Sequence, residues 1–281
     1  ETDQAIENYY KAIELDGETL DDYKNLGQLL IKADRQEEAL EVYEDYIELN
    51  PNDSAAQNTY AVLLENVSGD PLAVIEAKER ALESDPGNAN LKFEIARMYF
   101  RQQYYEESAD MFERYLEQNP EDVGALEYYG SALQNAGQFK DAIAVYEKAL
   151  ALQPDAVKIM CEMSTCYREL ENFRKAYSFA NQAIRTDSDF GLGYIVKGEV
   201  YEAVADDCIG QREERVAKFD DKLVYLKATE LYEQAYSDVE WGNYARQKAR
   251  SLSTTIPTKQ DYFMFPDKDK PALDCYSWLA F

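Results

Sequence analysis

The sequence repeats itself about every 34 residues, and this repeat limits the fold more than any other feature. In the unit from Gly124 to Pro154, apolar residues follow two helical faces, and Gly137 lies at a turn between them. One such helix pair cannot bury both of its apolar faces, so we expect successive pairs to stack around a continuous core. The units close, at spacings of 35, 34 and 34 residues, on Pro51, Pro86, Pro120 and Pro154.

Large and small residues recur at fixed positions of each unit, which lets two antiparallel helices approach closely. In the unit spanning 20–53 these residues are Tyr23, Leu26, Gly27, Leu30, Ala39, Tyr43 and Pro51. The pattern resembles the tetratricopeptide repeat, in its bacterial type, over residues 1–254. That resemblance implies an all-α fold: a right-handed solenoid of tandem helix pairs, with a concave groove lined by the first helix of each pair, and an extended C-terminal tail.

The positions of the repeats predict five parts of the chain. Residues 1–19 match the second helix of a truncated repeat, and residues 20–190 hold five repeats. A further repeat with a long insertion, of about 18 residues, spans 191–242. We expect a polar capping helix at 243–256, because a solenoid needs a solvated end, and an aromatic tail at 257–281.

Charge and composition exclude several classes of function. The chain carries 29 basic and 55 acidic residues, a formal charge of −26, which disfavours nucleic acid and suits protein partners with a basic surface. No apolar run is long enough to span a membrane, so we expect no direct membrane insertion. The chain has no histidine, which removes the usual nucleophile–base pairs and histidine metal sites. We therefore expect no catalytic residue, no metal and no cofactor.

The resemblance places candidate partner-binding residues in the concave groove. They are Lys24, Asn25, Gln28, Asn58, Phe93, Arg97, Arg101, Tyr128 and Arg168. One subset of the family grips the C-terminal carboxylates of heat-shock chaperones with a clamp of Lys, Asn, Asn, Lys and Arg. Only Lys24 fits that clamp here, so its function is not carried over. Phe93, Arg97 and Arg101 form a cationic and aromatic patch, with solvated residues paired to nearby acids as the alternative.

The tail should be buried, either on its own solenoid or in a partner, because its aromatic side chains would otherwise form a large exposed patch. Pro257, Pro266 and Pro271 favour an extended path without helix. The expected anchors are Tyr262, Phe263, Phe265, Tyr276 and Trp278.

The tail also resembles the C-terminal element of some exported bacterial proteins with these repeats. That resemblance implies that two of the cysteines could pair. Cys208 is the only cysteine in the insertion, and Cys275 is the only cysteine in the tail. In an oxidising cell envelope or periplasm they could form a disulfide once the tail folds back. The alternative is two unrelated thiols in a reducing cytoplasm, and the sequence leaves both compartments open.

The leading hypothesis is a non-catalytic protein–protein interaction scaffold. It would bind a protein segment, or dock as an accessory subunit of a larger assembly. The alternative is a regulatory or specificity region of an enzyme whose catalytic domain lies outside this chain. Binding of a small ligand has less support, because the chain has no cluster of cations or Gly-rich loop in the groove.

Overall fold

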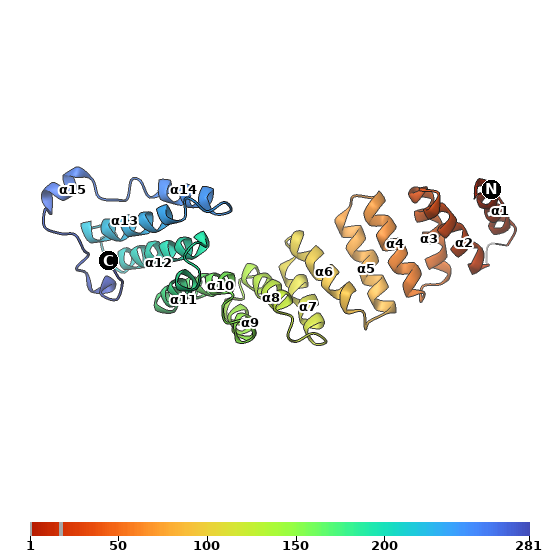
Figure 1. Ribbon diagram of the computed structural model, residues 1–281, viewed down its shortest axis with the longest axis horizontal. Helices are drawn as coiled ribbons and strands as arrows, with labels where there is room; N and C mark the ends of the chain where they lie inside the picture. The colour runs from red at the N-terminus through yellow and green to blue at the C-terminus, as the bar shows by residue number, and fades with distance from the viewer. Residues whose placement is uncertain (1, 17–18) are drawn as a thin grey trace. The chain divides into compact units, whose positions relative to one another are not determined.

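The computed structural model describes residues 2–16 and 19–281. All regular elements in these residues are helices, and consecutive helices pack in antiparallel pairs (Figure 1). The predicted all-α fold of tandem helix pairs is therefore confirmed. The chain divides into two compact units, Glu1–Ala132 and Leu133–Phe281.

The first unit holds three complete helix pairs, α2 with α3, α4 with α5 and α6 with α7, preceded by the single helix α1. Its helices are α1 (Thr2–Leu15), α2 (Leu20–Lys32), α3 (Gln36–Leu49), α4 (Ser54–Val67), α5 (Pro71–Ser84), α6 (Ala89–Arg101) and α7 (Tyr105–Leu116). Helix α8 (Val123–Asn135) contains the boundary between the units.

The second unit continues the pairing with α10 on α11 and α12 on α13. Its helices are α9 (Phe139–Leu152), α10 (Val157–Glu169), α11 (Phe173–Thr186), α12 (Gly191–Gly210), α13 (Phe219–Gln234), α14 (Gly242–Ser251), α15 (Lys259–Met264) and the 3-10 turn η1 (Asp274–Tyr276). The insertion lengthens two helices: α12 has 20 residues and α13 has 16, and the loop 211–218 joins them.

The helices of a pair are close because a small residue of the first faces an aromatic ring of the second. A Cβ atom added to Gly27 would lie 2.6 Å from the Tyr43 ring, and one added to Gly198 would lie 2.6 Å from the Tyr232 ring. Both rings are buried. The alternation of small and large residues in the repeat thus sets the distance between the two helices.

The turns after α2, α6, α8 and α10 share one backbone conformation. A residue with positive φ follows the first helix, and the next N–H bonds to the carbonyl five residues back, as in Gln138 N–H to Leu133 O at 2.8 Å. The turn after α4 also has positive φ, at Gly69, but there the next N–H bonds to the Ser68 hydroxyl. Gly69 and Gly137 take this left-handed conformation without steric cost. Three other turns use a residue with a side chain at the same position: Asp34, Gln103 and Glu171.

Candidate functional site

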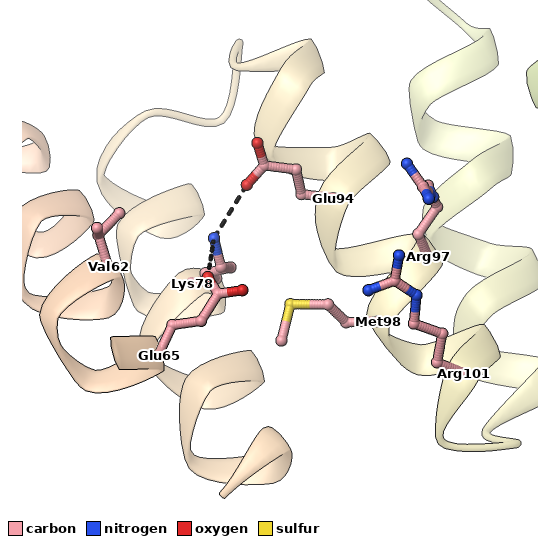
Figure 2. Close-up of a pocket in the computed structure, with 7 residues that line it drawn as sticks. All are labelled: Val62, Glu65, Lys78, Glu94, Arg97, Met98 and Arg101. Atoms are coloured by element: carbon pink, nitrogen blue, oxygen red, sulfur yellow. Dashed lines mark hydrogen bonds and ion pairs between the residues drawn. The ribbon is translucent and has the colours of Figure 1, made fainter. Parts of the chain in front are cut away.

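A recess of about 290 Å³ opens between α4 and α6 in the first unit, with α5 behind it. Figure 2 shows the carboxylates of Glu65 and Glu94 turned toward Lys78, while Arg97 and Arg101 project from α6. The residues that line it are Val62, Glu65, Lys78, Glu94, Arg97, Met98 and Arg101. A second recess of about 210 Å³ shares Glu65, Met98 and Arg101 with the first, so the two form one continuous surface.

Lys78 forms the floor of this recess. Its side chain is 5% exposed, and its Nζ lies 2.9 Å from Glu94 and 3.5 Å from Glu65. Both carboxylates are more than half exposed, so they remain partly solvated while they neutralise the lysine. Lys78 therefore presents no free charge to a ligand, and the cationic character of the recess comes from the two arginines.

Arg97 and Arg101 have no ion-pair partner among the residues that the structure describes. The guanidinium of Arg97 lies over two aromatic rings, 5.9 Å from the centre of Phe93 and 5.6 Å from that of Tyr128. These contacts orient the guanidinium but use none of its hydrogen-bond donors. The N–H groups of both arginines are thus available for an acceptor from outside the chain.

Arg97 lies beside a cluster of aromatic rings that includes Tyr128 of α8. The Tyr128 ring stacks on Phe112 with centroids 5.6 Å apart, and it meets Phe93 and Phe100 edge to face. Phe112 is buried, whereas Tyr128 is 37% exposed. Phe93 and Arg97 of the predicted patch thus form one contiguous group of side chains with Tyr128, whereas Arg101 makes no ring contact among the described residues.

The other predicted groove residues are not part of this recess. Lys24 is paired with Asp53 at 3.2 Å, and Asn25, Gln28 and Asn58 are exposed on the first helices α2 and α4. Arg168 belongs to the second unit and is neutralised by Glu199 and Glu169, each at 2.8 Å. Whether these residues bind a partner stays a prediction.

Sequence reasoning missed Val62, Lys78 and Met98. A signal for Lys78 was present: it stands at the repeat position that Tyr43 and Phe112 occupy in the neighbouring units. A lysine at a position where other repeats bury an aromatic ring either disrupts the core or extends until its ammonium reaches a carboxylate at the edge of the core. Val62 and Met98 carried no such signal, because apolar residues are common on the first helices.

The end of the tail packs on the second unit through Tyr276, which is 1% exposed, and Trp278, whose ring meets that of Tyr177 at 5.7 Å. The Tyr276 hydroxyl donates to Asp221, and the neighbouring Asp220 accepts from Lys268 and from the backbone N–H of Ala272. Burial raises the pKa of Asp220, but Lys268 and the Ala272 N–H hold it below its usual value. Sequence reasoning missed these two aspartates as tail contacts.

Two expectations about the tail are wrong. Residues 259–264 form α15, since the prolines flank this segment and do not interrupt it, and Thr258 and Asp261 cap its start. Phe263 is 86% exposed and does not anchor the tail. Tyr262 of α15 and Phe265, the residue that follows the helix, both contact the Phe219 ring, and Phe263 is left facing solvent.

The four cysteines fall into two classes. The sulfurs of Cys208 and Cys275 are bonded in the structure, with the Cα atoms 6.1 Å apart. Cys161 and Cys166 are buried free thiols in α10. Burial raises the pKa of both thiols, that of Cys166 to about 12, so neither is a reactive thiolate at neutral pH.

The described residues contain no cluster of three or more acidic or cysteine side chains that could hold a metal ion. None of the described helices is both long enough and apolar enough to cross a membrane.

Comparison with known proteins agrees with the repeat pattern. Models of the tetratricopeptide repeat match residues 23–53, 68–123, 93–157 and 133–191. The chain is 25% identical to protein FlbA of Caulobacter vibrioides over 146 residues, which are 50% of this chain and 24% of FlbA. It is 26% identical to the tetratricopeptide repeat-containing protein trd-1 of Caenorhabditis elegans over 167 residues, which are 59% of this chain and 20% of trd-1. The match thus spans between a fifth and a quarter of the length of these curated relatives.

Among solved structures, the chain is similar to YrrB, described as a TPR protein with an unusual peptide-binding site. The TM-score is 0.50 at 23% identity, and the match covers 66% of this chain and 95% of YrrB. This similarity concerns the fold alone. The relatives come from a bacterium and a nematode, so the bacterial type stays a prediction. The repeat pattern, the tandem helix pairs and the matching models together show that the chain belongs to the tetratricopeptide repeat family.

Proposed function

We propose that this chain is a non-catalytic interaction scaffold that binds a segment of a partner protein on the surface of α4, α6 and α8. The observation that carries the proposal is the pair Arg97 and Arg101. Acidic residues outnumber basic ones by 55 to 29, yet these two arginines have no acid of this chain within ion-pair distance in its described part. Arginine binds carboxylates in a two-pronged geometry, so a carboxylate of the partner is the complementary group.

The rings beside the arginines supply the apolar part of the site. Phe93 and Tyr128 are partly exposed and rigidly packed, and Val62 and Met98 line the adjoining recess. Buried apolar anchors next to a few well-placed polar groups are typical of peptide-binding surfaces. The ligand would thus carry a large apolar side chain next to an Asp, a Glu or a free C-terminal carboxylate.

The net charge of the chain restricts the rest of the ligand. A formal charge of −26 repels a segment that is acidic along its whole length. We therefore propose one carboxylate at the arginines, with neutral or basic residues on either side of it. This agrees with the expectation of a partner with a basic surface, because the acidic groups around the recess would face those flanking residues.

The class of function agrees with the fold. YrrB, which shares the fold, is described as having an unusual peptide-binding site, and proteins of this family generally act as interaction modules. The residues of the YrrB site are not transferred to this chain. Docking as an accessory subunit, and service as a regulatory region of an enzyme, remain predictions that no described feature favours over segment binding.

The proposal can be tested with a random-peptide phage library that displays both internal segments and free C-termini. Peptides selected on the full chain should share one carboxylate next to a large apolar residue. The variant Arg97→Glu with Arg101→Glu should weaken their binding by about 100-fold, which corresponds to losing two charge-assisted hydrogen-bonded contacts.

The matched control is Arg80→Glu with Arg114→Glu, which makes the same change of charge at exposed arginines of α5 and α7. It should weaken binding by less than about threefold, through long-range repulsion alone. Equal losses in the two variants would show that general charge is responsible and would contradict the site. Selected peptides without any carboxylate would contradict the proposed ligand.

A further inference from the structure

The last nine residues of the chain, 273–281, lie across three helices of the second unit. Figure 1 shows the chain leaving α14, forming α15 and returning to α12. The Trp278 ring contacts Tyr177 of α11, and the Phe281 ring contacts Tyr201 of α12 at 5.8 Å. Tyr276 bonds to Asp221 of α13. This segment, which we call the strap, covers an aromatic surface that the helices alone would expose.

The strap fits this surface closely but through few side chains. Tyr276 and Leu279 are its buried residues. The Tyr201 hydroxyl donates to the carbonyl oxygen of Ala280 at 2.5 Å, and the guanidinium of Arg174 lies 5.0 Å from the centre of the Trp278 ring. Most other strap residues are exposed or half-buried. Two buried side chains and these few contacts therefore have to offset the conformational entropy that nine residues lose when the strap becomes ordered.

The part of the tail before the strap is attached by contacts of its own. Asp261 of α15 bonds to Lys222 at 2.8 Å, and the Phe265 ring stacks on Phe219 at 4.9 Å. Lys268 and Ala272 both bond to Asp220. None of these contacts involves a cysteine, so residues 258–272 can remain docked when the cysteines are reduced.

Besides the backbone, the strap is joined covalently to the helices by the bond from Cys275 to Cys208 at the end of α12. We infer that the strap is a redox-controlled cover: the Cys208–Cys275 disulfide holds it on α11–α13, and reduction releases residues 273–281 while α15 and the solenoid stay folded. The inference is independent of the proposed peptide site, which lies in the first unit.

The chemical step is an ordinary thiol–disulfide exchange with a dithiol reductant. A thiolate of the reductant attacks one sulfur, the Cys208–Cys275 bond breaks, and a mixed disulfide forms. The second thiol of the reductant then resolves the mixed disulfide. Two electrons and two protons pass to the chain, which leaves with two thiols, and the reductant leaves as its own disulfide. Cys161 and Cys166 stay thiols throughout, since both are buried in α10.

Hydrogen exchange followed by mass spectrometry tests the inference on the full chain, with and without dithiothreitol. Reduction should make exchange in 273–281 faster by about tenfold or more, with unchanged exchange in α11, α12 and α13. The Trp241→Phe variant leaves Trp278 as the remaining tryptophan, and its fluorescence should shift to longer wavelength on reduction. Cys208→Ser and Cys275→Ser should each show the released strap without reductant and should not respond to it.

Three outcomes would overturn the inference. Alkylation of all four cysteines in protein that was purified without reductant would show that the bond does not form. Unchanged exchange in 273–281 after reduction would show that the noncovalent contacts suffice to hold the strap. Faster exchange throughout α11–α13, together with lost helix signal, would show that the bond stabilises the whole end of the fold and controls no separate cover.

Discussion

At the scale of single residues, Lys78 shows how a single difference between repeats turns a core position into part of the surface. Its aliphatic stem fills the slot where Tyr43 and Phe112 place a ring, and its ammonium reaches Glu65 and Glu94 at the rim. The lysine carries a desolvation cost that an apolar side chain would avoid. The same change opens the recess, because a lysine head is narrower than an aromatic ring.

Lys78→Met should therefore leave the free energy of unfolding unchanged or raise it by about 1 kcal/mol. Methionine keeps the length of the stem, and the two glutamates are more than half exposed, so neither is left as a buried unpaired charge. Urea unfolding measures the effect. Lys24→Met, at an exposed lysine paired with Asp53, is the control and should cost at most about 1 kcal/mol. A loss well above that for Lys78→Met would mean that the buried ion pair is a net contributor to stability.

At the scale of the elements, the turn inside each pair sets where the second helix begins. Gln103 has a φ of 64° and the following Tyr104 N–H bonds to the Tyr99 carbonyl at 3.0 Å. The left-handed conformation costs a residue with a Cβ more than it costs glycine. The repeat at Gly137 avoids that cost, and the repeat at Gln103 does not.

Gln103→Gly should accordingly raise the free energy of unfolding by about 0.5–1 kcal/mol. This is the gain from relieving the backbone strain, minus the entropic cost of ordering a glycine that is more flexible in the unfolded chain. Gln102→Gly is the matched control, because its φ is −85° and glycine brings no relief there. That variant should lose about 0.5–1 kcal/mol. If both glycine variants are destabilised alike in thermal or urea unfolding, the turn is not strained at Gln103.

One carboxylate, that of Asp261, is part of the contact between α15 and α13. Hydrogen bonds from the Lys222 ammonium and from Thr258 lower the pKa of Asp261 from 3.8 to about 2. A carboxylate with a lowered pKa in the folded state stabilises above its unfolded value, and the stabilisation is lost as the pH falls through the folded value. The α15 contact should therefore persist at pH 5 and weaken between about pH 4 and pH 2.

Asp261→Asn should reproduce that acid effect at neutral pH. Hydrogen exchange in residues 259–264, corrected for its intrinsic dependence on pH, should be faster in the variant, because the amide keeps no charge for Lys222. Asp267→Asn, an exposed position in the same tail, should leave exchange in α15 unchanged. Equal protection of α15 in Asp261→Asn and in the unmodified chain would show that Phe265 on Phe219 is sufficient to dock it.

The fold was predictable from the sequence, and the sites were predictable only in part. The period of small and large residues predicts the helix pairs directly, since Gly27 must face a ring such as Tyr43. The family resemblance placed Phe93 and Arg97 on the same first helix, and their role in binding stays a prediction. The recess could not be foreseen, because it depends on how far the Lys78 stem extends between two helices. The direction of Phe263 depends on a six-residue helix between prolines, where sequence reasoning favoured an extended path.

At the scale of the whole molecule, the dominant physical quantity is the surplus of acidic charge. The formal charge of −26 is spread along the whole chain, and the ion pairs described above use only a small part of the 55 acidic residues. The remaining carboxylates repel one another in the folded chain more than in the expanded unfolded chain, where they lie farther apart. Self-repulsion therefore lowers the stability of the folded state, and salt should relieve it.

Raising sodium chloride from about 10 mM to about 150 mM should raise the melting temperature by a few degrees, because the Debye length falls from about 30 Å to about 8 Å while contacts inside the core are little affected. This range of concentration lies below that in which salts act on apolar burial.

The variant Glu83→Lys with Asp110→Lys, at two exposed acids of α5 and α7, makes the chain less negative. It should melt higher than the parent at low salt and respond less to added salt. A melting temperature that falls as salt is added would mean that ion pairs such as Lys24 with Asp53 and Arg168 with Glu199 stabilise the chain more than its surplus charge destabilises it.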